Sequence, residues 1–153
     1  MNHVKYSHLG GEHIVPAPLQ LEIEKAITAI SVRPTKGSAA KIRKAFIQSI
    51  AVAGWSGEAP VSKESNITVT STKDDVGLCL QTGNISRIYA DLLKLQTMYL
   101  NSAIKSAVII IPSHPMAKKL GSNIVNAKRL EREIAIFRLA YSAPTLIYSL
   151  ESA

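Results

Sequence analysis

The chain has 153 residues, of which 46% are hydrophobic, and a formal net charge of +7. This length suits one domain with a real core and is too short for two ordinary domains. No apolar run approaches the roughly 20 residues that span a bilayer; the chain opens without a secretory signal, and its single cysteine excludes an internal disulfide. A cytoplasmic location is therefore expected.

The positive charge favours a polyanionic partner, because lysine and arginine side chains release counterions when they neutralise phosphates. Aromatic residues make up only 5% of the chain and offer no stacking platform for single strands, so duplex DNA is the expected polyanion. Solvated helix faces are the alternative explanation for the two basic groups. These groups are Lys36, Lys41, Arg43 and Lys44, and Lys118, Lys119, Lys128, Arg129 and Arg132.

The first 17 residues contain glycine and proline and lack a periodic pattern. We expect a flexible arm over residues 1–17 and a single domain over residues 18–153. Apolar residues then recur at helical spacing from Leu19 to Ile30, which predicts a helix that ends before Pro34.

Ser38 is a suitable N-cap for a second predicted helix, which continues to Gly54. Trp55 follows within turn chemistry and is expected beneath the sheet. Two strands are predicted over residues 67–70 and 76–82, because β-branched residues alternate in the first and apolar residues dominate the second.

The rest of the chain alternates between helix and strand. Residues 86–100 are predicted as a helix, 106–112 as a buried strand, and 145–150 as a closing strand. Residues 116–141 are predicted to be largely helical, with an interruption at Gly121, Ser122 and Asn123. This order predicts a mixed α/β sheet flanked by helices.

Residues 76–87 carry the sequence Val-Gly-Leu-Cys-Leu-Gln-Thr-Gly-Asn-Ile-Ser-Arg. The segment resembles the active-site strand of the BamHI-like and BglII-like type II restriction endonucleases, whose pattern is hydrophobic-E-x-(E/Q)-x-(G/S)-N. Residues 106–112 look like the central strand of these enzymes, and residues 119–123 resemble their recognition loop. The resemblance implies a restriction-endonuclease-like fold with the PD-(D/E)XK core, in a chain shorter than those enzymes.

Enzymes of this class hold magnesium with acids on two strands, so that the metal activates water. By the resemblance, Thr70 occupies the aspartate position, Cys79 the glutamate position, and Gln81 the general-base or metal-proximal position. A hydroxyl and a thiol supply no negative charge at neutral pH, and sulfur is a soft ligand. No catalytic or metal site is therefore expected to be intact, no metal cofactor is expected, and hydrolysis should be lost.

The alternative is that acids have moved to new positions. Asp75 and Glu64 are the expected substitutes, with Asp74 and Glu58 also close in sequence; magnesium would then be the cofactor. The simpler explanation of Asp74 and Asp75 is an ordinary solvated β-turn, because an acid on a flexible turn seldom recreates the octahedral geometry of magnesium. The four histidines show no metal-ligand spacing, and Cys79 is interpreted as a small buried residue.

The resemblance also implies the DNA contacts. Asn84 and Ser86 correspond to residues that face the major groove, and Arg87 is placed to bind a guanine edge or a phosphate. Ser122 and Asn123 form a second recognition pair, with Lys118 and Lys119 as phosphate contacts. Helix capping is the competing role for Asn84, Ser86 and Ser122.

The expected function is duplex DNA binding by a pseudonuclease derived from a type II restriction endonuclease, acting by occupancy or through a partner. A homodimer is expected, because such enzymes bind palindromes with two-fold symmetry, and a related nuclease is a further partner. Whether the protein is an enzyme stays open, with the balance against it. The competing functions are a magnesium-dependent endonuclease and a module that binds only protein.

Overall fold

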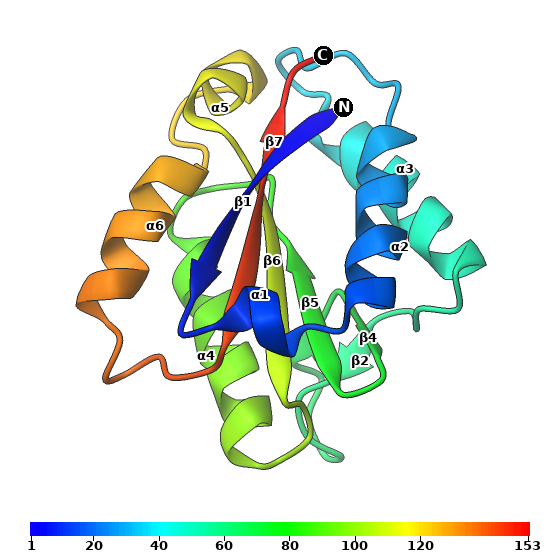
Figure 1. Cartoon of the computed structure of the whole chain (residues 1–153). Coiled ribbons are helices and arrows are strands. Elements are labelled where there is room, and N and C mark those ends of the chain that lie inside the picture. Colours follow the sequence, from blue (N-terminus) through cyan, green and yellow to red (C-terminus); the bar gives the residue numbers. More distant parts are fainter.

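A five-stranded sheet runs through the middle of the computed structural model, which describes all 153 residues (Figure 1). Its strand order is β1-β7-β6-β5-β4, and β2 pairs with β3 in a separate small sheet. The inner strands β5, β6 and β7 are parallel, and the edge strands β1 and β4 are antiparallel to their neighbours. The strands are β1 (Asn2–His8), β2 (Ala59–Pro60), β3 (Thr68–Val69), β4 (Ser71–Lys73), β5 (Val76–Leu80), β6 (Ser106–Pro112) and β7 (Thr145–Glu151).

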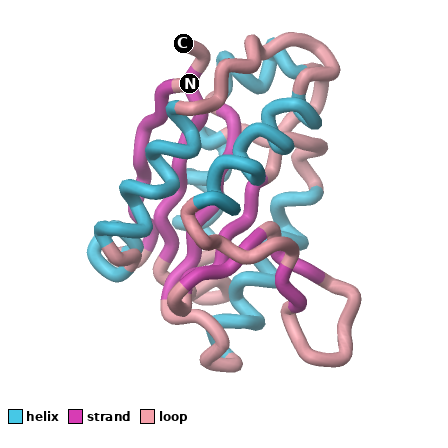
Figure 2. The backbone as a smooth tube through the Cα atoms, turned by 90° about the vertical axis from the view of Figure 1, so that its right-hand side faces the viewer, coloured by secondary structure: helices cyan, strands magenta, loops and turns pink.

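Helices cover both faces of the sheet, so the predicted mixed α/β architecture is confirmed. Helices α2 and α3 lie on one face and α4 and α6 on the other, as Figure 1 shows. The same arrangement, seen from the α2 and α3 side in Figure 2, places these two helices in front of the strands. The helices are α1 (Gly11–Ile14), α2 (Ala17–Thr28), α3 (Ala39–Val52), α4 (Arg87–Leu100), α5 (His114–Leu120) and α6 (Ala127–Ile136). None is both long and apolar enough to cross a bilayer.

The two faces of the sheet form two cores, and β6 contributes to both. Val108 and Ile110 pack toward α2 and α3, whereas Ile109 and Ile111 pack toward α4 and α6. All seven β6 residues are buried, which is why this strand forms a continuous apolar run rather than an alternating one. Trp55 is buried in the first core, as expected, and its Nε1 donates to Glu22 at 2.8 Å.

Residues 1–17 do not form the expected flexible arm. Residues 2–8 make β1, which pairs with β7 along its whole length, and α1 follows directly. The strand escaped prediction because it lies at the sheet edge, where its sequence Asn-His-Val-Lys-Tyr-Ser-His keeps mainly polar side chains. Edge strands with exposed polar residues lack the apolar pattern that marks buried ones.

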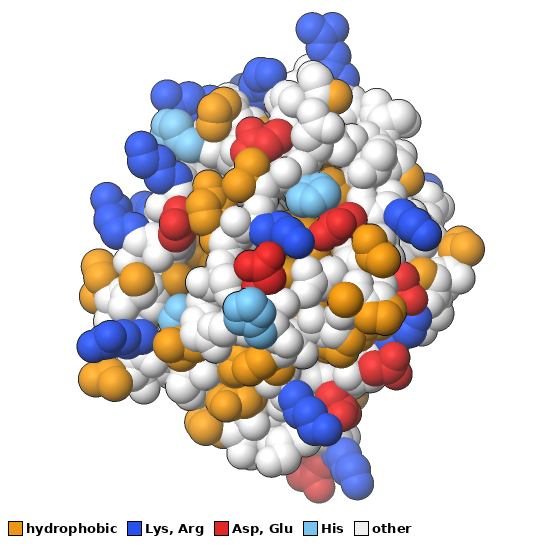
Figure 3. Space-filling model, viewed as in Figure 1, with side chains coloured by type: hydrophobic (Ala, Val, Ile, Leu, Met, Phe, Trp, Pro, Cys, Tyr) orange, Lys and Arg blue, Asp and Glu red, His pale blue; other side chains and the backbone are white.

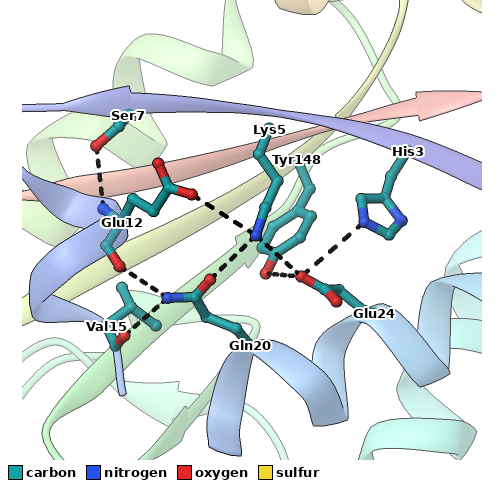
Figure 4. A network of polar contacts seen from close by, with 8 residues as sticks. All are labelled: His3, Lys5, Ser7, Glu12, Val15, Gln20, Glu24 and Tyr148. Carbon is teal, nitrogen blue, oxygen red and sulfur yellow. Dashed lines mark hydrogen bonds and ion pairs between the residues drawn. The ribbon is translucent and has the colours of Figure 1, made fainter. Parts of the chain in front are cut away.

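A polar network fixes β1 to its surroundings (Figure 4). The Lys5 ammonium lies 3.3 Å from Glu24 on α2 and 3.8 Å from Glu12 on α1. The buried Tyr148 of β7 donates its hydroxyl to Glu24 at 3.3 Å, and Gln20 donates to the main-chain carbonyl of Glu12 at 2.9 Å. The network joins four elements, so β1 and α1 are part of the folded domain.

Two predicted elements have different bounds in the structure. Residues 67–70 do not pair with the following strand, since β3 pairs with β2 and only β4 pairs with β5. The predicted helix over residues 116–141 is two helices, α5 and α6, separated at the expected interruption. Asn126, not Ser122, caps α6, because its side chain accepts from the Arg129 amide at 3.1 Å.

Gly11 provides a test of the packing between α1 and β7. A Cβ on Gly11 would overlap the main chain of Thr145, and main chain cannot move aside as a flexible side chain can. Gly11→Ala should lower the free energy of unfolding by about 2 kcal/mol or more, measured by urea denaturation. Gly57→Ala is the control, since a Cβ there meets no atom within 4 Å. Equal stabilities of the two variants would contradict the packing.

Candidate functional site

A polar pocket lies where β5 ends, with residues of both α3 and α4 in its lining. Its volume is about 500 Å³, and only four of its 14 lining residues are hydrophobic. The lining comes from α3, from the small second sheet, from the end of β5 and from α4. Two of the three positions expected from the resemblance, Thr70 and Gln81, line this pocket.

Thr70 sits at the break between β3 and β4, where its hydroxyl has a structural task. Its Oγ1 accepts from the Leu80 amide at 3.0 Å and so takes the place of a main-chain acceptor. Cys79 is 2% exposed within the core beneath α4. Burial, assisted by the nearby Asp91 charge, raises the pKa of the Cys79 thiol far above its ordinary value, so the sulfur stays protonated and neutral.

Asp91 on α4 is a buried carboxylate that the resemblance did not identify. It is 6% exposed and lines the pocket. Its Oδ2 accepts from Gln81 Nε2 at 2.8 Å, and its Oδ1 lies 3.2 Å from the Lys94 ammonium. The Asp91 carboxylate therefore accepts from the Gln81 amide with one oxygen and binds the Lys94 ammonium with the other.

The residues present do not fit a magnesium site of this class. Hard divalent cations need several oxygen ligands, and carboxylates supply the matching charge. The pocket offers one buried carboxylate, already paired with Lys94, and one exposed one, Glu58. No group of three or more His, Cys, Asp or Glu side chains is arranged to hold a metal ion.

The expected substitute acids lie elsewhere. Asp75 occupies the turn before β5, which places it at the opposite end of that strand from the pocket, about 16 Å along a five-residue strand. Asp74 and Asp75 both have positive φ values, 45° and 63°, as a two-residue hairpin turn of type I′ requires, and Asp75 pairs with Lys105 at 3.4 Å. Glu64 is exposed and does not line the pocket.

The two loops expected to contact DNA lie side by side. Asn84 and Ile124 form an isolated β-bridge. The Ile85 amide donates to the Asn123 carbonyl at 3.0 Å, and the Val125 amide donates to the Gly83 carbonyl at 3.1 Å. The structure thus brings together the pairs Asn84 with Ser86 and Ser122 with Asn123, all of them exposed.

The expected capping role is not seen for Asn84 or Ser86: Ser86 is the N-cap residue of α4 and makes no side-chain capping hydrogen bond, while Asn84 stabilises the turn just before it. Its Oδ1 accepts from both the amide and the hydroxyl of Ser86 at 2.9 Å, which organises the turn that starts α4. The side-chain NH₂ group of Asn84 makes no hydrogen bond within the chain, so its two N–H donors stay available to a ligand. The side chains of this turn are therefore not used to cap α4.

The other residues expected to contact DNA lie in different parts of the structure, at the pocket and on α5. Arg87 lines the pocket rather than the paired loops. Lys118 and Lys119 are exposed on α5, where Lys119 donates to Ser152 at 3.1 Å. Figure 3 shows lysine and arginine side chains along the side of the molecule that α5 and α6 form. On α6, Arg129 already forms an ion pair with Glu133, with the two charged groups 2.6 Å apart.

Asp91 and Lys94 are the pocket residues that sequence reasoning missed. Arg87, Asp91 and Lys94 lie four and three residues apart, and helical geometry puts residues with this spacing on one face. Because the helix begins just after the signature segment, that spacing was the available signal. Arg43 was noted only as part of a basic group, although its Nη1 donates to the Leu80 carbonyl at 2.7 Å.

The comparisons with known proteins agree with the fold. The sequence model of the family described as restriction endonuclease BglII/BglIII matches residues 3–150. The crystal structure of the restriction endonuclease BglII complexed with a DNA 16-mer is similar with a TM-score of 0.88 and 12% identity, covering 100% of this chain and 79% of that one. Free BglII is similar with a TM-score of 0.79 and 14% identity, covering 100% and 81%. No curated protein matches the sequence.

The burial of Cys79 yields a chemical test of the pocket. A thiol that is neutral and enclosed should react with iodoacetamide at less than about one-hundredth of the rate of a free cysteine. Since its pKa is raised, the thiolate is a very small fraction of Cys79 at both pH 7 and pH 9, so the native rate should stay far below that of the urea-unfolded chain at both pH values. Mass spectrometry of the alkylated protein gives both rates. Rapid alkylation of the native chain would mean that the sulfur opens into the pocket.

Proposed function

The chain belongs to the BglII/BglIII restriction endonuclease family, and on that premise we propose that it binds duplex DNA without efficient cleavage. The observation that carries the proposal is the site itself. The two strand positions where the resemblance places acids hold Thr70, whose hydroxyl bonds to main chain, and Cys79, which is buried as a neutral thiol. The protein would act by occupying DNA.

Three features support DNA as the ligand. The net charge is +7, and positive charge is the main source of affinity for a phosphate backbone. The paired loops present the Asn84 and Asn123 side chains to solvent from one place, as contacts to base edges require. The similar BglII structure is of a complex with DNA, which makes the same ligand class the natural one for this chain.

A magnesium-dependent endonuclease is the competing function, and one observation favours testing it. Asp91 and Glu58 line the same pocket as Gln81, so these two acids, rather than Asp75 and Glu64, are the ones to test. Against this function stands the pairing of Asp91 with Lys94, which already neutralises the buried carboxylate. If the chain has no affinity for DNA, the conclusion is that it binds only protein.

We further propose a homodimer that forms through an apolar surface on α4 and α6. An apolar groove of about 220 Å³ lies between α4 and the segment after α6, lined by Leu92, Leu93 and Phe137 among others. Leu93 in this groove is 70% exposed, and Leu139, which follows the lining residue Phe137 in the chain, is 93% exposed. Grouped exposed apolar side chains of this kind mark association surfaces. The same surface would accept a related nuclease as a mixed-dimer partner, in the cytoplasm where DNA lies.

DNA binding and cleavage can be separated in one assay series. A magnesium titration on supercoiled plasmid should give no nicking, while a gel shift should show affinity that falls at least about tenfold between roughly 50 and 200 mM salt, as several phosphate contacts predict. Asp91→Asn is the diagnostic variant, and Asp75→Ala its control. Magnesium-dependent cleavage that disappears only in Asp91→Asn would replace the proposal with the endonuclease function. Absence of DNA binding at low salt would leave the protein-only function.

The dimer surface has its own test. Leu93→Glu combined with Leu139→Glu places charges in the apolar surface, and should shift the protein from dimer to monomer in light scattering at micromolar concentrations. Val52→Glu is the matched control, because Val52 is 91% exposed at the end of α3 on the other face. A wild-type protein that is monomeric at these concentrations would contradict the proposed dimer.

A further inference from the structure

We propose that the pocket at the end of β5 binds a phosphodiester group of the DNA backbone directly, with the guanidinium groups of Arg43 and Arg87 supplying the positive charge and no metal ion taking part. The inference rests on the proposed function, since it names the group that this site receives. The groups that bind the ligand carry the opposite charge from those of a nuclease centre. Arginine side chains here attract the phosphate, whereas acids in a nuclease centre attract a metal.

Arg43 is positioned for this role by main chain. Its side chain comes from α3 and reaches across to the strand, where Nη1 donates to the Leu80 carbonyl at 2.7 Å. That bond holds the guanidinium at the pocket wall and uses one of its several N–H donors. Arg43 forms no ion pair, although it is partly buried. Its charge is therefore uncompensated by any carboxylate of the chain.

Arg87 approaches the same pocket from the first turn of α4. Its side chain passes over Gly83, where a Cβ added to the glycine would lie 3.7 Å from Nη1. Arg87 is exposed, and its side chain likewise has no ion pair and no hydrogen bond within the chain. Two guanidinium groups from different helices thus line one pocket, and such groups can donate two parallel hydrogen bonds to phosphate oxygens.

The carboxylates of the pocket do not cancel these charges. Asp91 is paired with Lys94 and accepts from Gln81, so its charge is matched within α4. Glu58 is exposed at the pocket lining and has no cationic partner. Three cations therefore face two acids. In an ordinary metal centre the two strand acids would repel a phosphate, whereas Thr70 and Cys79 carry no charge to do so.

The pocket also has the polarity and size for such a group. The hydroxyl-bearing residues Thr68 and Thr82 line it together with the arginines, and hydroxyl groups donate to phosphate oxygens. Its volume of about 500 Å³ exceeds that of one phosphate, so adjoining sugar atoms can enter. The paired loops lie just beyond Gly83, so a strand whose phosphate enters the pocket would run toward Asn84.

The experiment compares Arg43→Gln/Arg87→Gln with wild type by fluorescence anisotropy on a labelled duplex of about 30 base pairs, with EDTA or with magnesium. The double variant should bind at least about 10-fold more weakly near 0.1 M salt, and the slope of log affinity against log salt should fall by about 1 to 2. EDTA should not change wild-type binding. Lys25→Gln/Lys105→Gln is the charge-matched control: both lysines lie outside the pocket, and Lys105 is at the far end of β5.

The single variant Arg87→Gln controls for a folding defect, because the Arg87 side chain makes no hydrogen bond within the chain. It should show part of the loss of DNA affinity with an unchanged melting temperature. A second readout needs no DNA. Titration of inorganic phosphate should shift the NMR signals of Gly83 and the Gln81 side-chain amide in wild type, and not in the double variant.

These outcomes separate the two proposals. DNA binding that is equally weakened by the control pair, or that requires magnesium, overturns the phosphate pocket and leaves duplex binding intact. If phosphate shifts the NMR signals but the protein has no affinity for DNA, the pocket binds anions and its assignment to the DNA backbone is overturned.

Discussion

The parallel pairing of β5 with β6 is the constraint on which the site depends. The ladder runs from Val76 to Leu80 and extends one residue further, where the Gln81 amide donates to the Ile110 carbonyl at 2.9 Å. That last bond fixes the point at which the chain leaves the sheet. It also sets where Gln81 meets Asp91 of α4, where the turn at Asn84 lies and where α4 begins. The pocket is therefore built on the end of a fully buried strand pair.

Neutral side chains at this strand end bear on the electrostatic character of the pocket more than on its shape. Thr70 and Cys79 satisfy packing and main-chain hydrogen bonding without contributing charge, and the remaining buried acid is balanced by a lysine one turn along its own helix. A site that holds cations by carboxylates and one that holds anions by guanidinium groups can thus share one backbone. The family fold sets where a ligand meets the protein, and a few side chains set which ligand it is.

The sequence predicted what strong local patterns encode. The apolar run of β6 and the helical spacing of α2, α3 and α4 matched the structure because burial imposes those patterns. Strand β1 was missed because an edge strand needs no such pattern, and its anchoring depends on Lys5 meeting Glu24 of α2, a contact between separate elements. Asp91 was missed for a related reason. A resemblance carries over the positions of a motif, but a residue on the next helix enters the site only when the fold brings it there.

The main-chain bonds between residues 83–85 and 123–125 have an evolutionary consequence. Two segments distant in the sequence share one short ladder, so a substitution that shifts either segment also moves the side chains of the other. Changes in these loops should therefore combine non-additively, as coupled neighbours do. New ligand preferences would then arise through paired replacements, each of little use by itself, and this epistasis would slow the divergence of recognition among relatives that keep the ladder.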